Sequence, residues 1–297
     1  MDISEAAVTV SDAIYNGTER KPEVRVAHKG RVLKQGTDYT VSYENNVNAG
    51  IKTAKAVVTG DNVALSGSRE MAFSILPGKT TRGDMFNLAG NVKVTWKAVP
   101  GAKYYKVYRE GVTKASESVS EPVIVTSRLV GWDKAPGLVN GHAYRYRIVA
   151  SLTGAGGAGG GSGDAVGGGA GGNAASGGSG SGAGGDLSGD SPLSYSKLMY
   201  RLKTVAIKRV KNTEPGKAKV WFNKTTSGDS YVLQYSERED MAGAKTKVVQ
   251  GAENTSYTIS GLKKGKTYYI SIRVRKKVGG INYYTTFGVA KKIKIEK

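Results

Sequence analysis

The residue types that carry most enzyme chemistry are scarce in this chain. Its 297 residues include no Cys and only two His, His28 and His142. Cysteine nucleophiles, disulfides and thiolate metal sites are therefore excluded, and imidazole catalysis has almost no material. Zinc-protease, nucleophile-elbow and calcium-loop patterns are absent, and acidic residues such as Glu237, Glu239 and Asp240 fall mainly in expected turns and strand edges. We expect a protein that is not an enzyme and that uses no cofactor or metal.

Two glycine-containing segments match the sequences of phosphate-binding motifs but not the secondary structure that such motifs require. Residues 154–159 read Gly-x-Gly-x-x-Gly after an expected strand, but no parallel βαβ unit surrounds them. Residues 261–267 resemble a P-loop that is one residue short, and they precede an expected strand. Without a helix N-terminus to face a phosphate, neither segment predicts a nucleotide site.

A tripeptide of Arg82, Gly83 and Asp84 has the sequence that integrins read in animal adhesion proteins when it lies on an exposed loop. Here it lies between the first and second expected modules rather than in a loop between late strands. Short motifs of this kind also arise by chance in a glycine-rich chain. Adhesion through these residues is one hypothesis, which a comparison of Asp84→Glu with the wild type in cell adhesion would test.

The strongest candidate for binding is a basic and aromatic surface near the C-terminus. The net charge rises from 0 over residues 1–77, through +6 over 78–202, to +14 over 203–297. A solvated, Lys-rich surface that keeps a β protein soluble and protects its edges is the favoured interpretation. The alternative is a surface that contacts a polyanion or a glycan rather than nucleic acid. The candidate residues are Lys263, Lys264, Lys266, Tyr269, Arg273, Arg275, Lys276, Lys277 and Tyr283.

Short strands must position these residues, because no window shows a sustained helical period. Residues 8–15 alternate before a turn signal at Asn16-Gly17, and residues 23–36 read as two strands around a turn at Lys29-Gly30. Three further strands are expected before Pro77 and Gly78 end the first module.

The first segment has a characteristic set of turn and aromatic residues: Tyr15-Asn16-Gly17, Pro22, Gly36-Thr37-Asp38-Tyr39, Tyr43, Asn45-Asn46, Ala49-Gly50 and Phe73. On these residues it resembles the bacterial immunoglobulin-like repeats over most of residues 6–76. It departs from them at Asn62-Val63, where the repeats usually carry an aromatic residue near a Gly. Such repeats occur in surface and secreted proteins of Gram-positive bacteria, so the resemblance implies an extracellular or cell-surface location.

Two later segments resemble fibronectin type III domains. In the first of them, Trp96 corresponds to the buried tryptophan of the second strand. Tyr144 ends a Leu-x-x-Gly-x-x-Tyr pattern that implies a tyrosine corner. In the last segment Phe222 takes the place of Trp96, and Tyr268 ends the same pattern. These four residues are expected to be structural.

The two segments are also repeats of each other. Val94 and Val220 are 126 residues apart, and so are Tyr105 and Tyr231. That period exceeds the length of a fibronectin type III domain, about 90–100 residues, so the first repeat must contain an insertion.

The insertion is the tract at residues 154–189, in which 19 of 36 residues are Gly. This composition predicts disorder. A linker between domains is the obvious interpretation. However, residues 194–202 match the last strand of the C-terminal repeat, so we expect a long F–G loop inside one module.

The sequence therefore predicts an all-β chain of three consecutive β-sandwich modules. We expect an immunoglobulin-like domain at 1–77, a fibronectin type III-like domain at 78–203 with the insertion at 154–189, and a second one at 204–297. The resemblance implies non-catalytic binding or spacer modules, with cell-wall polymers, glycans or a host surface protein as partners. The alternatives are an adhesin that contacts a host protein or glycan, and the accessory region of an enzyme whose catalytic domain lies upstream.

Two features of the chain bear on its location. No apolar run approaches the roughly 20 residues of a membrane span. The first 15 residues lack the basic and apolar regions of a signal peptide. We therefore expect either a protein that stays inside the cell or part of a longer chain. The ligand and the oligomeric state are not predicted.

Overall fold

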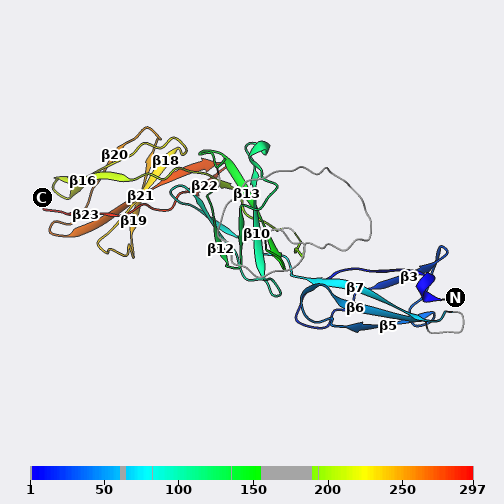
Figure 1. Ribbon diagram of the computed structural model, residues 1–297. Coiled ribbons are helices and arrows are strands. Elements are labelled where there is room, and N and C mark those ends of the chain that lie inside the picture. Colours follow the sequence, from blue (N-terminus) through cyan, green and yellow to red (C-terminus); the bar gives the residue numbers. More distant parts are fainter. Residues whose placement is uncertain are drawn as a thin grey trace.

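The computed structural model describes residues 2–60, 65–81, 83–134, 136–154, 189–192 and 194–296. The described chain forms three β-sandwiches in a row, with the termini at opposite ends (Figure 1). Each sandwich encloses its own hydrophobic core. The predicted fold class, three consecutive β-sandwich modules, is confirmed.

The first module packs a three-stranded sheet, in the order β1-β3-β4, against a four-stranded sheet, in the order β2-β7-β6-β5. The alternating residues 8–15 are divided between the two sheets, because the chain changes sheets after β1 and β2 pairs in parallel with β7. Asp12 holds this crossing, since its carboxylate accepts the Ser74 N–H at 2.6 Å. The elements are η1 (Ile3–Glu5), β1 (Ala7–Val10), β2 (Ala13–Ile14), β3 (Val24–His28), β4 (Arg31–Val32), β5 (Tyr39–Glu44), β6 (Gly50–Gly60) and β7 (Ser68–Leu76).

The turn predicted at Lys29-Gly30 is confirmed. Both residues have positive φ angles, 43° and 82°, and they join β3 to β4 as a hairpin in which His28 pairs with Arg31. Two residues with positive φ match the right-handed twist of the paired strands, which is why glycine suits the second position.

The second module has sheets in the orders β12-β9-β8 and β11-β10-β13-β14, with β15 also paired to β13. Buried side chains alternate along β9 because one face of its sheet meets the other sheet, whereas residues 148–151 at the end of β13 are all buried. The elements are β8 (Asp84–Asn87), β9 (Val92–Thr95), β10 (Tyr104–Gly111), η2 (Ala115–Glu117), β11 (Ile124–Thr126), β12 (Val130–Asp133), β13 (Ala143–Ser151), β14 (Ser194–Tyr195) and β15 (Met199–Tyr200).

The third module repeats this arrangement, with sheets β16-β17-β20 and β19-β18-β21-β22, and with β23 also paired to β21. After β21 the chain turns back at once to form β22. β22 returns at Ile281, directly after a turn at Gly279 and Gly280, both of which have positive φ. The elements are β16 (Ile207–Glu214), β17 (Lys217–Phe222), β18 (Ser230–Ser236), β19 (Lys245–Gln250), β20 (Ser256–Ile259), β21 (Thr267–Val278), β22 (Ile281–Tyr284) and β23 (Lys291–Lys294).

The glycine-rich tract connects two neighbouring strands of the second module. Residues 155–188 lie outside the described residues, but the chain on either side of them is paired. Ser151 and Asp190 form an antiparallel bridge, and the Leu152 N–H donates to the Gly189 carbonyl at 2.9 Å. Downstream, β14 and β15 pair with β13. The segments before and after the tract are thus the F and G strands of one sandwich.

The only helices of the described chain are two turns of 3₁₀ helix. None of its helices has the length and apolar character that crossing a bilayer requires.

Candidate binding site at the junction of the second and third modules

Asn87, the last residue of β8, joins the second module to the third. Its side chain is 4% exposed, its amide nitrogen donates to the Tyr200 carbonyl at 2.7 Å, and its amide oxygen accepts the Leu202 N–H at 3.0 Å. Its backbone carbonyl accepts both the N–H and the hydroxyl of Thr286 at 3.1 Å, and it forms a parallel bridge with Thr285. One buried residue therefore bonds the second module to the connecting segment and to the third module.

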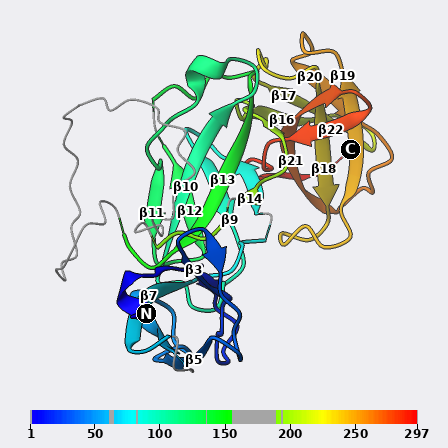
Figure 2. The same ribbon diagram turned by 90° about the vertical axis from the view of Figure 1, so that its right-hand side faces the viewer.

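Three further contacts close this junction. The guanidinium of Arg201 donates to the Leu88 carbonyl at 3.0 Å, and burial lowers the pKa of Arg201 from its ordinary value. The rings of Tyr200 and Tyr283 meet edge to face at 4.9 Å, and the Lys276 ammonium lies 5.5 Å from the Tyr200 ring. Figure 2 shows the third module set against one side of the second.

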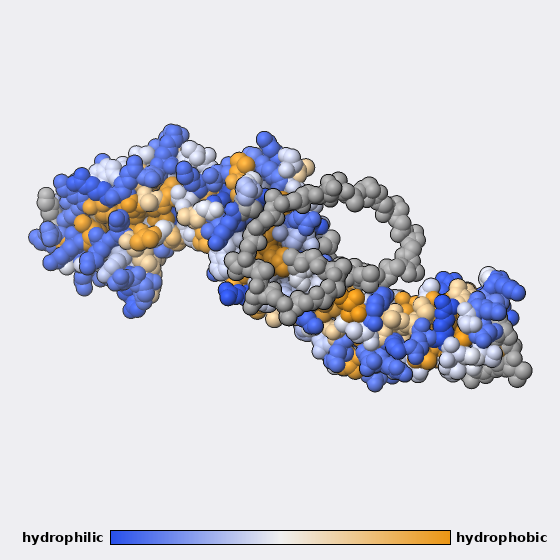
Figure 3. Space-filling view, in the orientation of Figure 1, coloured by the Kyte–Doolittle hydropathy of each residue, from blue (hydrophilic) through white to orange (hydrophobic). Residues whose placement is uncertain are grey.

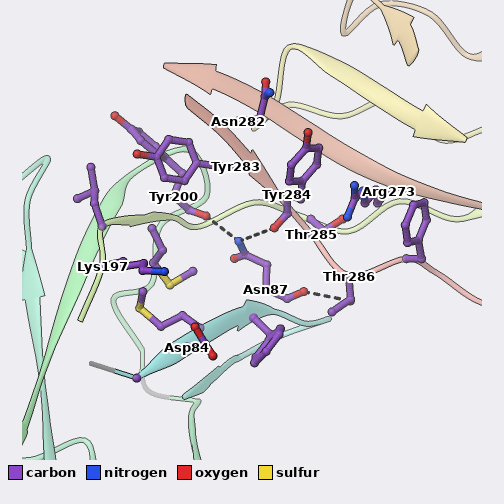
Figure 4. A pocket seen from close by; sticks show the side chains of 16 residues that line it. Asp84, Asn87, Lys197, Tyr200, Arg273, Asn282, Tyr283, Tyr284, Thr285 and Thr286 are labelled. Carbon is purple, nitrogen blue, oxygen red and sulfur yellow. Dashed lines mark hydrogen bonds between the residues drawn. The ribbon is translucent and has the colours of Figure 1, made fainter. Parts of the chain in front are cut away.

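A pocket of about 490 Å³ opens beside these contacts. Its walls come from Gly83 and β8, from residues 197–200, from β22 and the three residues after it, and from Arg273 on β21. In Figure 4, Lys197 and Tyr200 lie on one side of the pocket, Arg273 and Tyr284 on the other, and Asp84 below them.

Arg273 is held between two aromatic rings at the edge of this pocket. Its guanidinium carbon lies 3.9 Å from the centre of the Tyr284 ring and 4.4 Å from that of Phe287. Its Nε is buried and has no hydrogen-bond partner, and none of the ion pairs among the described residues includes it. Burial lowers the pKa of Arg273 from its ordinary value. The rings supply the only cation-specific contacts of this side chain in the described structure.

The structure divides the predicted basic surface between the two ends of β21. Lys263, Lys264 and Lys266 lie in the loop before β21, whereas Lys276 and Lys277 lie near its other end. A strand rises about 3.3 Å per residue, so these ends are roughly 36 Å apart. Only one end therefore lies at the junction pocket.

The other residues of the predicted surface also lie apart, because each contacts different neighbouring strands. Arg273 and Tyr283 line the pocket. Arg275 shares a face with Arg273 but turns toward β18 and β19, where it donates to Ser230 at 2.8 Å and Gln250 at 3.0 Å. Tyr269 lies near the opposite end, paired with Ser236 and Lys292. Hydrophilic residues nevertheless cover much of the third module in the view of Figure 3.

The residues expected to be structural lie in the sandwich cores. Trp96 packs on Tyr105 with 5.5 Å between ring centres, and Phe222 packs on Tyr231 with 4.8 Å. The Tyr144 hydroxyl accepts the Val139 N–H at 2.8 Å. Likewise, the Tyr268 hydroxyl accepts the Lys263 N–H at 3.0 Å. Both tyrosines thus bond back to the connection that precedes their strand.

The remaining sequence motifs have no common site. Arg82 lies outside the described residues, Gly83 is buried against β9, and Asp84 opens β8, so this part of the tripeptide belongs to a paired strand. Of the Gly-x-Gly-x-x-Gly segment, only Gly154 is described. The P-loop-like segment leads into β21, as predicted. The described residues contain no group of three or more His, Asp or Glu that could hold a metal ion.

Sequence reasoning missed a buried ionic group in the second module. The Arg109 guanidinium lies 3.1 Å from a carboxylate oxygen of Asp133, which also accepts the Tyr146 hydroxyl at 2.8 Å. Arg109 and Asp133 are 3% and 0% exposed. Burial, together with the Asp133 charge, raises the pKa of Tyr146 well above its ordinary value. The signal was available, because alternation along residues 105–109 places Arg109 on the face of Tyr105 and Val107.

Glu117 makes a second polar group beside the first. One of its carboxylate oxygens accepts the Tyr144 hydroxyl at 2.7 Å, and the other lies 2.7 Å from Nδ1 of His142. The hydrogen bond from Tyr144, followed by the contact with His142, lowers the pKa of Glu117. Burial raises the pKa of Tyr144 to about 12. These groups stabilise the turn that precedes β13.

Comparisons with known proteins give a structural likeness and no family. No protein-family model matches the chain, and no curated protein does. Among solved structures, the FN1–FN3 domains of chicken CNTN1 align over 98% of both chains, at 11% sequence identity and a TM-score of 0.35.

Proposed function

We propose that this chain is a non-catalytic array that spaces and binds, in an extracellular or cell-surface protein of a Gram-positive bacterium. The immunoglobulin-like pattern of residues 6–76 supports the location. The excess of cations in the third module favours wall polymers or glycans as partners. Contact with a host protein is the alternative partner.

The observation that carries the spacer proposal is the bonding at Asn87. A flexible tether between modules would leave the strand end solvated. Here a buried amide satisfies backbone groups of the connecting segment, and its own carbonyl is satisfied by the third module. An unsatisfied buried polar group costs about 1–3 kcal/mol, so reorienting the modules would break several contacts at such a cost.

The first junction is also packed rather than open. The Thr80 hydroxyl donates to the Ile148 carbonyl at 2.7 Å, and the Ser194 hydroxyl donates to the Thr80 carbonyl at 2.6 Å. These bonds hold the connecting segment on β13 and β14. At Gly101, an added Cβ would lie 2.9 Å from the ring of Tyr15 in the first module, so the two modules touch closely.

Pulsed electron spin resonance tests the spacer proposal directly, since the chain has no Cys of its own. Spin labels at Lys114→Cys and Lys245→Cys, both on exposed positions, report the distance between the second and third modules. We expect one narrow distance distribution, which Asn87→Ala broadens because it removes the side-chain bonds to Tyr200, to Leu202 and, in the third module, to the Tyr284 carbonyl at 3.4 Å.

The matched control is Asn48→Ala, an exposed asparagine of the first module, which should leave the distribution unchanged. A broad distribution in the wild-type chain would contradict the proposal, because it would describe modules that move independently.

A further inference from the structure

The junction pocket contains a cation that lacks an anion. Arg273 is partly buried, its Nε has no hydrogen-bond partner, and no ion pair of the described residues includes it. Removing a charge from water is unfavourable unless a counter-charge or hydrogen bonds compensate it. The two rings offset only part of this cost, so an anionic group at Arg273 would gain both ion pairing and hydrogen bonds.

The rings also orient the guanidinium. With Tyr284 and Phe287 packed on it, Arg273 can donate only through its edge, which borders the pocket. A planar fork held in one orientation suits carboxylate and sulfate groups, because two parallel N–H bonds can form without further loss of side-chain freedom.

The rest of the pocket is suited to a sugar more than to a polyphosphate. Phe86, which is 41% exposed, offers a ring face on one wall. Asn282, Lys197 and Asp84 add an amide, an ammonium and a carboxylate, which can bond to hydroxyl groups. The carboxylate of Asp84 would repel a densely charged chain such as nucleic acid, whereas a sugar with one acidic group per unit leaves hydroxyls for it.

A row of exposed side chains continues from the pocket across the three-stranded sheet of the second module. Phe86 on β8 pairs with Lys93 on β9, which pairs with Trp132 on β12. The Lys93 ammonium lies 5.8 Å from the Phe86 ring, and Trp132 is 41% exposed. Ring, cation and ring thus follow one another at the spacing of neighbouring strands, about 4.8 Å.

We propose that the junction pocket binds an acidic saccharide, with Arg273 taking its carboxylate or sulfate and Phe86 stacking on a sugar face. The row through Lys93 and Trp132 then extends the contact to neighbouring units of a longer chain. This inference rests on the fixed junction proposed above, because the pocket walls come from both modules.

Calorimetric titration of the full chain tests the site with three probes: tetragalacturonate, a sulfated cellotetraose and neutral cellotetraose. We expect one or both acidic probes to bind at least tenfold more tightly than the neutral one, and the two acidic arms distinguish carboxylate from sulfate. Arg273→Gln should weaken the binding at least tenfold.

The matched control is Arg275→Gln, which removes the same charge from the same face of β21 two residues away and should change affinity less than twofold. Equal losses in the two variants would overturn the proposal, since they would reflect net charge alone. Failure of all three probes to bind at millimolar concentration would also overturn it.

A second variant covers the case in which Arg273→Gln disturbs the junction. If the spin-label distances broaden in that variant, Asn282→Ala is tested, since it changes the pocket rim and leaves the stacked rings in place. Loss of affinity in Asn282→Ala supports the site, and unchanged affinity refutes it. A broad distance distribution in the wild type would refute the fixed junction, whereas a narrow distribution together with unchanged affinity in Arg273→Gln would refute the site alone.

Discussion

Shortening the glycine-rich connection should stabilise the second module. The stem that closes it is bonded on both sides, from Leu152 to Gly189 and from Ser191 to the Ala150 carbonyl at 2.7 Å. Deleting residues 157–186 reduces the connection between Leu152 and Gly189 from 36 to 6 residues. Closing a loop costs about (3/2)RT ln n, so the deletion should raise the free energy of unfolding by about 1.6 kcal/mol. For a module of this size, that corresponds to roughly 10 °C in Tm.

Urea unfolding followed by tryptophan fluorescence measures this change in a Trp221→Phe background. The remaining tryptophans, Trp96 and Trp132, both lie in the second module. Asp190→Ala is the opposing variant, because it leaves the nearly buried Lys106 ammonium without the carboxylate at 2.9 Å. It should lower the free energy of unfolding by about 3 kcal/mol. An unchanged or lowered stability in the deletion variant would refute the view that the stem closes one loop of one sandwich.

Two further predictions concern the turn before the F strand. Tyr144→Phe should lower the free energy of unfolding of the second module by about 1–2 kcal/mol, because the Val139 N–H loses its acceptor at 2.8 Å. Tyr268→Phe should cost the third module less, since its bonds are longer, at 3.0 and 3.3 Å. Fluorescence of a chain that keeps Trp221 reports the third module, and a larger loss in Tyr268→Phe than in Tyr144→Phe would contradict this order. Glu117 has a folded pKa below its ordinary value because Tyr144 donates to it, so its contribution is present above the unfolded pKa of about 4.3 and is lost as pH falls further. Glu117→Gln should therefore unfold more easily than the wild type at pH 7, with the difference closing below about pH 4; a difference constant from pH 7 to 3 would refute this assignment.

The repeat within the chain was predictable because it depends on local spacing. Tyr105 and Tyr231 occupy the same place in their modules, and each hydroxyl accepts a backbone N–H six residues earlier, at 2.9 Å from Val99 and 2.8 Å from Thr225. Such a bond needs only one tyrosine at a fixed distance from the end of the preceding strand. The strands of both modules could therefore be predicted from the alternation of side chains and from the turn signals.

The junction was not predictable, because its bonds join residues far apart in the sequence. Asn87 bonds to groups 113 and 199 residues away. Nothing in the residues around it distinguishes it from a polar residue at a strand end. Alternation correctly put Arg273 and Arg275 on one face, but the neighbours that separate them come from other strands, β22 for one and β18 for the other. The positions of basic residues along one strand therefore give only candidate site residues. The neighbouring strands decide which of these residues share a site.

The placement of the two unusual features in the second module gives them separate roles. The stem at Gly189 lies against the first module, where an added Cβ would be 2.8 Å from Ile51. The pocket lies at the opposite end, where β15 and Asn87 meet the third module. Changes at sites with no shared contact add independently. The stability of the loop stem and the affinity proposed for the pocket should thus vary separately, so shortening the glycine-rich connection should leave the geometry of the pocket intact.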